Sequence, residues 1–266
     1  MFKTRLLSGI VLVILALFLI ITGGNVLWGA LAVISLIGMY ELYRVFGMEK
    51  SVLGITGYLM ALLYYITLII PIFSDAMLFV LGTLVIMMFV YVFTYPKYKT
   101  EQILAAFFGV FYVAVMLSFV YQTRMLESGM YIVWLIFLCS WGSDTCAYCV
   151  GVLIGKHKMA PKLSPKKSIE GAVGGVLGSM LLTFIYANIF KTAMDIQAEQ
   201  MLMLAVISGV GALISMVGDL TASAIKRNYD IKDYGHLIPG HGGILDRFDS
   251  VIFTAPIVYY LATILM

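Results

Sequence analysis

Long apolar stretches constrain this chain more than any other feature. Residues 6–40 contain no charged residue. Further apolar runs lie near 51–70, 76–94, 102–121, 130–154, 171–190, 203–224 and 250–266. A helix needs about 20 predominantly apolar residues to cross the hydrocarbon core of a bilayer. Gly23 and Gly24 predict a turn inside the first run. The sequence therefore predicts an all-α polytopic membrane protein with about nine transmembrane helices.

Composition excludes several classes of protein. Hydrophobic residues make up 62% of the chain, against about 45–50% in an ordinary soluble domain. Charged residues make up only 12%, which argues against a soluble globular enzyme and a disordered protein. The net charge of +3 comes from basic residues spread over loops, so we expect no nucleic-acid partner. Cys139, Cys146 and Cys149 share one apolar stretch, which favours small buried side chains over a disulfide framework.

The distribution of basic residues predicts the orientation in the membrane. Nine spans place the N-terminus and the segments 41–50, 95–101, 155–170 and 225–249 on one side. All but two of the 17 lysines and arginines lie on that side, the exceptions being Arg124 and Lys191. Short loops rich in Lys and Arg stay cytoplasmic. We expect a multi-pass protein of the cell inner (cytoplasmic) membrane, with a retained first helix and a cytoplasmic N-terminus.

Unusual polar residues concentrate in the second half of the chain. We therefore divide it into N-terminal transmembrane helices, 1–130, and a catalytic transmembrane region, 131–266, with cytoplasmic loops 155–170 and 225–249. Asp144 and Asp219 lie within or at the edge of apolar runs. A carboxylate in mid-membrane costs about 2.5–3.5 kcal/mol on insertion scales. Such residues need a metal, a basic partner or a water-filled cavity, which makes them candidate functional residues.

Two further aspartates indicate a metal site. Asp246 and Asp249 are three residues apart at the start of the last predicted helix, so they share a face. Two close carboxylates repel each other unless a cation lies between them. Carboxylate oxygens suit a hard cation such as Mg²⁺. Asp219 can complete the site from the preceding helix, whose face also carries Ser223 and the pair Lys226–Arg227.

Glycines and cations beside these carboxylates indicate a phosphate-bearing substrate. Gly242 and Gly243 allow a bound group to approach the backbone closely. Positive charge comes from Lys226, Arg227, Lys232 and Arg247. Magnesium ligands beside several cations are typical of sites for phosphate or pyrophosphate groups. In the loop 155–170 we expect Ser164, Lys166 and Lys167 to contact phosphate. For Lys156, Lys158 and Lys162, phosphate binding and positive-inside anchoring stay equally open.

Other features have simpler interpretations. Gly171, Gly174, Gly175 and Gly178 form overlapping G-x-x-x-G patterns, which indicate close helix packing within one chain or in a homodimer. His236 and His241 lack the spacing of zinc ligands on a helix. The pair Glu41 and Arg44 is expected to form an ion pair at the membrane interface.

The segment from Ser223 to Asp249 resembles the signature of the phosphatidate cytidylyltransferases, also called CDP-diacylglycerol synthases. The matching positions are Ser223, Lys226, Arg227, Lys232, Asp233, Gly235, Pro239, His241, Gly242, Gly243, Asp246, Arg247 and Asp249. A second similar region contains Asp144, Ala147–Tyr148, Gly155–Lys156, Ser164–Ser168 and Glu170–Gly171, and Gly218–Leu220 also fits. The chain departs from the family pattern at Val152, Ser168 and Ala222, none of which is a proposed metal ligand.

The resemblance implies that CTP and phosphatidic acid give CDP-diacylglycerol and pyrophosphate at the cytoplasmic membrane edge. It implies Mg²⁺ held by Asp219, Asp246 and Asp249, with Asp144 beside a second cation or orienting a cation. Phosphate neutralisation is implied for Lys226, Arg227 and Arg247. The implied substrate contacts are Ser164, Lys166, Lys167, Ser223, Lys232, His241, Gly242 and Gly243.

Two alternatives remain open from the residues. Asp144 and Asp219 inside the membrane would also suit a proton- or Na⁺-coupled transporter, although we find no inverted repeat. An enzyme with the same site can also act on another lipid phosphate, because acyl chains contact only generic apolar surfaces. Proton- or Na⁺-driven flux in vesicles tests the transporter alternative. A comparison of different lipid phosphates as substrates tests the second alternative.

Overall fold

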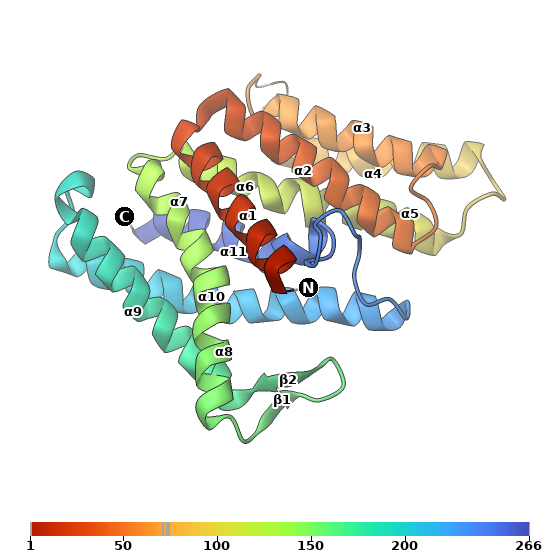
Figure 1. Ribbon diagram of the computed structural model, residues 1–266. Coiled ribbons are helices and arrows are strands. Elements are labelled where there is room, and N and C mark those ends of the chain that lie inside the picture. The colour runs from red at the N-terminus through yellow and green to blue at the C-terminus, as the bar shows by residue number, and fades with distance from the viewer. Residues whose placement is uncertain (1, 71, 73–74, 266) are drawn as a thin grey trace. The chain divides into compact units, whose positions relative to one another are not determined.

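The apolar runs form helices (Figure 1). The computed structural model describes residues 2–70, 72 and 75–265, while the side chains of residues 2–6, including Lys3 and Arg5, lie outside that description. The first elements are α1 (Phe2–Thr22), α2 (Gly24–Val45), α3 (Val52–Thr67), α4 (Ala76–Phe93), α5 (Thr100–Gly109), η1 (Val110–Val115) and α6 (Met116–Arg124). They are followed by α7 (Gly129–Phe137), η2 (Leu138–Gly142), α8 (Ser143–Ile154), β1 (Lys158–Ala160), β2 (Ser164–Ser168), α9 (Ile169–Met194), α10 (Ala198–Asn228) and α11 (Leu245–Leu265).

The predicted all-α polytopic class is confirmed. Among the described residues, 7 helical segments are long and apolar enough to cross a membrane. Two further apolar helices, α1 with 21 residues and α3 with 16, lie where the sequence predicts spans. The count of nine stays a prediction, because 7 other helical segments are the ones that qualify by length and composition among the described residues.

The chain forms two compact units that interleave along the sequence. The first consists of 1–15, 25–118 and 233–246, and the second of 16–24, 119–232 and 247–266. The loop after α10 therefore packs with the early helices, and most of the other predicted site residues lie in the second unit. The functional division at residue 130 stays a prediction.

A buried tyrosine organises the core of the first unit. Tyr43 on α2 is fully buried, and its hydroxyl donates to the carbonyl oxygen of Ala106 on α5 at 2.7 Å. A side chain at Gly57 or Gly109 would clash with the tyrosine ring. These glycines let α3 and α5 pack directly against α2 around one aromatic side chain.

Glycines also hold the second unit together, along the contact between α8 and α9. A Cβ at Gly174 would lie 2.5 Å from Val150, and one at Gly178 would lie 2.5 Å from Cys146. A Cβ at Gly175 would lie 2.9 Å from Ser143 Oγ. The G-x-x-x-G patterns therefore serve packing within one chain. They give no support to a homodimer.

The sequence did not predict the hairpin or the π-helical segments. β1 and β2 pair antiparallel between the C-terminal end of α8 and the N-terminal end of α9 (Figure 1). Leu163 N–H donates to Ala160 O at 3.2 Å and closes the turn. Ser168 then caps α9, since its hydroxyl accepts the Gly171 N–H at 3.1 Å. The lysine-rich loop 155–170 is thus an ordered structure anchored to a helix.

Candidate functional site

A pocket that carries charged side chains in a mostly apolar lining opens in the second unit beside the hairpin. Its volume is about 570 Å³, and it is formed by α8, β1, β2, α9 and α10. Its charged lining residues are Asp144, Asp219, Lys158, Lys166 and Lys167. Its remaining lining is mostly apolar or small: Ala147, Tyr148, Gly151, Val152, Met159, Ser168, Gly171, Ala172 and Met216. Carboxylates from two helices and ammonium groups from the hairpin thus line one cavity.

An ion pair joins these two groups of charges. Lys167 Nζ contacts Asp219 Oδ2, and both side chains are about three-quarters buried, with exposed fractions of 25% and 27%. Ser223 Oγ, one turn further along α10, donates to Asp219 Oδ1 at 3.5 Å. Asp144 on α8 lies close enough to Lys167, Asp219 and Arg247 to interact electrostatically. The hairpin therefore supplies a countercharge to the carboxylates of α8 and α10.

Asp249 extends this cluster from α11. Its side chain is buried, and Oδ1 accepts the Ser250 N–H at 2.8 Å. Asp249 interacts electrostatically with Asp219, Asp144 and Lys226. The second unit thus brings together three of the four predicted aspartates, from three different helices.

Gly218 allows α10 to approach α11 next to these aspartates. A Cβ at this position would lie 2.8 Å from the carbonyl oxygen of Asp249 and 2.9 Å from the ring of Phe253. We expect Gly218→Val to force the helices apart and to lower stability by about 1–3 kcal/mol. Activity should fall further, since Asp219 and Asp249 would separate. Thermal unfolding in detergent and turnover measure the two effects.

Gly82→Val is the matched control, because a Cβ at Gly82 on α4 meets no atom within 4 Å. Equal stability and activity of Gly218→Val and the control would contradict this account of the helix contact.

In the first unit, a buried carboxylate holds the loop that carries the other motif residues. Glu41 is 4% exposed. Its carboxylate accepts the N–H of Ile244 at 3.0 Å and that of Leu245 at 2.8 Å. These donors lie at the start of α11, where backbone N–H groups lack partners within the helix. Arg44 donates to Tyr234 O from the same helix α2. The sequence predicts an interfacial ion pair for Glu41 and Arg44. That prediction does not include the contacts of both side chains with the backbone of the loop 233–246 and the start of α11.

Asp246 also binds loop backbone. Its Oδ2 accepts the N–H of Tyr234 at 2.8 Å and of Gly243 at 3.0 Å. A side chain at Gly235 or Gly243 would clash with Glu41. Gly242 has φ +85°, which favours glycine. These glycines therefore have a structural reason to be present, and their contact with substrate stays a prediction.

The remaining predicted residues are distributed between the units. In the first unit, His241 Nδ1 lies 2.8 Å from Ser8 Oγ, within hydrogen-bonding distance. In the second, Arg227 and Lys232 are exposed and Ser164 is half-buried. Trp141 Nε1 donates to Arg247 O at 3.4 Å. Their roles toward substrate stay predictions.

Within the described part of the chain, no three His, Cys, Asp or Glu side chains lie close enough to hold a metal ion. The donors that the second unit gathers are nevertheless all carboxylates, and their mutual repulsion favours a cation among them. Such an oxygen donor set fits a hard divalent cation. The fourth predicted aspartate, Asp246, lies in the first unit, where its Oδ2 accepts two backbone N–H groups.

Comparison with known proteins decides the family. The model of the cytidylyltransferase family matches residues 3–265. The chain belongs to the phosphatidate cytidylyltransferase family. It is thus an enzyme of the nucleotidyltransferase class and a multi-pass membrane protein.

Three relatives, each named phosphatidate cytidylyltransferase, align with nearly the whole chain. One from Staphylococcus epidermidis is 35% identical and one from Staphylococcus aureus is 34% identical, with 97% of this chain and 98% of each relative covered. One from Bacillus subtilis is 28% identical, with 97% of both chains covered. Family membership removes the transporter alternative.

Sequence reasoning missed three contributors. Lys158 lines the pocket, although its sequence position gave no preference between binding and anchoring. Glu41 was detectable by the argument applied to Asp144, since it also ends an apolar run. Glu170 was noticed only as part of a motif, and its contacts depend on a hairpin that has no strong strand signal.

Proposed function

We propose that this chain transfers the cytidylyl group of CTP to phosphatidic acid, giving CDP-diacylglycerol and pyrophosphate in phospholipid biosynthesis. The observation that carries the proposal is the pocket in which Asp144 and Asp219 lie with Lys158, Lys166 and Lys167. The names of the relatives support the choice of substrates. The basic loops support a site at the cytoplasmic face of the cell membrane.

The reaction is an in-line displacement at phosphorus. A phosphate oxygen of the lipid attacks the α-phosphorus of CTP, and the bond to the oxygen that bridges to the β-phosphate breaks. Pyrophosphate leaves with that electron pair. A phosphomonoester is already anionic near neutral pH, so the nucleophile needs no strong general base. Catalysis then depends on positioning and on neutralising charge.

The cations of the chain bring two anionic substrates together. Lys166 and Lys167 would bind CTP phosphates from the hairpin, with Ser164 beside them. Phosphate charge would be neutralised by Lys226, Arg227 and Arg247, as we propose from the motif. The further proposed contacts are Ser223, Lys232, His241, Gly242 and Gly243. Binding of phosphate by Lys167 would compete with its ion pair to Asp219.

The carboxylates are proposed to hold Mg²⁺. The ligands that we propose are Asp219, Asp246 and Asp249, with Asp144 as the candidate beside a second cation. When bound, the ion would neutralise and polarise the reacting phosphoryl group. The all-oxygen donor set supports a hard cation.

Lys158 tests whether the pocket binds the nucleotide. The sequence alone leaves phosphate binding and anchoring equally open for Lys158. Its place in the pocket lining favours binding, and we expect Lys158→Ala to raise the KM for CTP about tenfold, as loss of a charged hydrogen bond would. Lys162→Ala is the control, because Lys162 is exposed and outside the pocket lining. Equal KM values for the two variants would contradict nucleotide binding in this pocket.

Pyrophosphate release by the purified protein tests the substrate class. We expect release to require CTP together with phosphatidic acid, and not diacylglycerol, which lacks the attacking phosphate. Faster release with a polyprenyl phosphate than with phosphatidic acid would instead support the second alternative from the sequence.

A further inference from the structure

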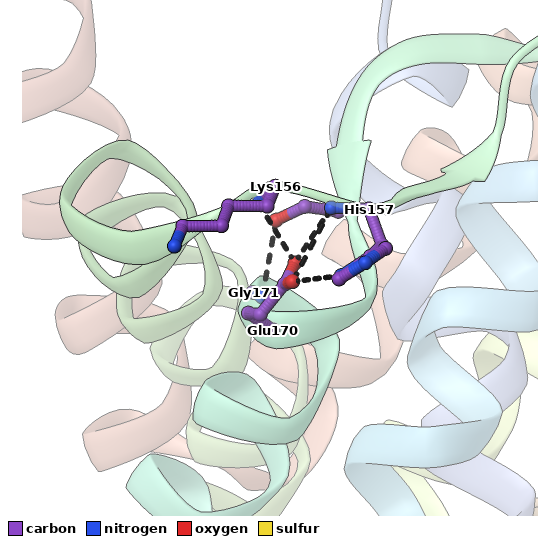
Figure 2. Close-up of polar contacts among 5 residues, drawn as sticks. Lys156, His157, Glu170 and Gly171 are labelled. Carbon is purple, nitrogen blue, oxygen red and sulfur yellow. Dashed lines mark hydrogen bonds and ion pairs between the residues drawn. The ribbon is translucent and has the colours of Figure 1, made fainter.

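Glu170 joins the first turn of α9 to the segment between α8 and β1 (Figure 2). Its Oε2 accepts the Lys156 N–H at 3.1 Å. The His157 N–H lies 3.2 Å from both carboxylate oxygens, and His157 Nδ1 lies 2.6 Å from Oε1. One side chain therefore binds two successive backbone donors and an imidazole.

The residues next to Glu170 strengthen this connection. Ile169 N–H donates to His157 O at 2.9 Å. A Cβ at Gly155 would lie 2.6 Å from Ser168 Oγ, so the end of α8 packs directly on the cap of α9. The contacts of 168–170 thus fix both ends of the hairpin to the same helix turn. The next residue along, Gly171, lines the pocket.

The hairpin is held at this base and, further along β2, by the ion pair of Lys167 with Asp219. Its strands contain only 3 and 5 residues, and an isolated two-stranded hairpin is at best marginally stable in water. It nevertheless carries all three lysines that line the pocket. The His157 side chain is 75% exposed, so its ion pair with Glu170 alone contributes little. The carboxylate also accepts two backbone N–H groups, which connect the first turn of α9 directly to the chain entering the hairpin.

We propose that Glu170 is a positioning residue that holds the hairpin at the angle at which its lysines face the pocket. It acts through the backbone of Lys156 and His157 and touches neither substrate. The positioning of the hairpin rests on these contacts of Glu170, while its effect on nucleotide binding rests on the proposed function.

Limited proteolysis tests the positioning without any assumption about the reaction. The variants are Glu170→Ala, which removes every contact, and Glu170→Gln, which keeps one acceptor oxygen. We expect trypsin to cleave after the hairpin lysines about tenfold faster in Glu170→Ala and about threefold faster in Glu170→Gln. The control is Glu199→Ala, an exposed first-turn glutamate of α10, which should be cleaved as the wild type is. Equal hairpin cleavage in Glu170→Ala and the wild type would overturn the proposal.

Steady-state kinetics then separate positioning from a general structural role. We expect Glu170→Ala to raise the KM for CTP about tenfold, with kcat within about threefold of the wild type, and Glu170→Gln to lie between. A loss of kcat at unchanged KM, together with a lower unfolding temperature, would overturn the proposal. If the wild type does not use CTP while Glu170→Ala still exposes the hairpin, the proposed function fails and the positioning stands.

Discussion

Asp249→Asn should abolish turnover while the protein still inserts and folds. The carboxylate is buried among Asp144, Asp219 and Lys226, and we propose that it holds the catalytic cation. Removing its charge should lower kcat by about a thousandfold, to near the background of the assay. The substitution keeps an oxygen for the Ser250 N–H and removes a charge that is costly to bury. Thermal stability in detergent should therefore be unchanged or higher.

The matched control for this change is Asp195→Asn. Asp195 is exposed in the same unit, and its φ of +52° is one that asparagine adopts readily. It should retain wild-type turnover. If Asp249→Asn retained turnover, or lost its activity only because the protein failed to fold, the aspartate would be a structural residue.

Glu41→Ala should destabilise the protein strongly. The change leaves the part-buried N–H of Ile244 and the buried N–H of Leu245 without their acceptor. Each such loss costs about 1–3 kcal/mol, so the free energy of unfolding should fall by about 2–6 kcal/mol. Glu41→Gln keeps one acceptor oxygen and should lose about half as much. The unfolding temperature in detergent measures both effects.

Glu101→Ala provides the comparison, because Glu101 is an exposed first-turn glutamate of α5 in the same unit. Its unfolding temperature should match that of the wild type. A Glu41→Ala protein as stable as this control would show that water can replace the carboxylate, and that the loop 233–246 does not depend on α2.

The sequence predicted the helices well because the membrane leaves a chain few choices. A backbone in hydrocarbon must satisfy its own hydrogen bonds, so each apolar run becomes a helix. The run predicted near 171–190, for example, is α9, which extends from Ile169 to Met194. The hairpin was not predictable in this way, since Lys158–Ser168 has no alternation of apolar and polar residues and is held by contacts at its base.

The candidate site was predictable where a residue conflicts with its surroundings. Asp144 and Asp219 stand out because a charge in an apolar run is costly, and the structure places both in one pocket. Sequence spacing treats Asp246 and Asp249 alike. Packing separates them, because Asp246 accepts backbone N–H groups in the first unit and Asp249 joins the carboxylates of the second. Whether both hold a metal stays a prediction.

Transfer of label from α-³²P-CTP to lipid is the most direct test of the central claim. Detergent-purified protein is incubated with labelled CTP and phosphatidic acid, with and without Mg²⁺, beside Asp249→Asn and Asp195→Asn. We predict that label enters the organic phase only with Mg²⁺, in the wild type and Asp195→Asn but not in Asp249→Asn. Absence of labelled lipid from folded, monodisperse wild-type protein would contradict CTP and phosphatidic acid as its substrates.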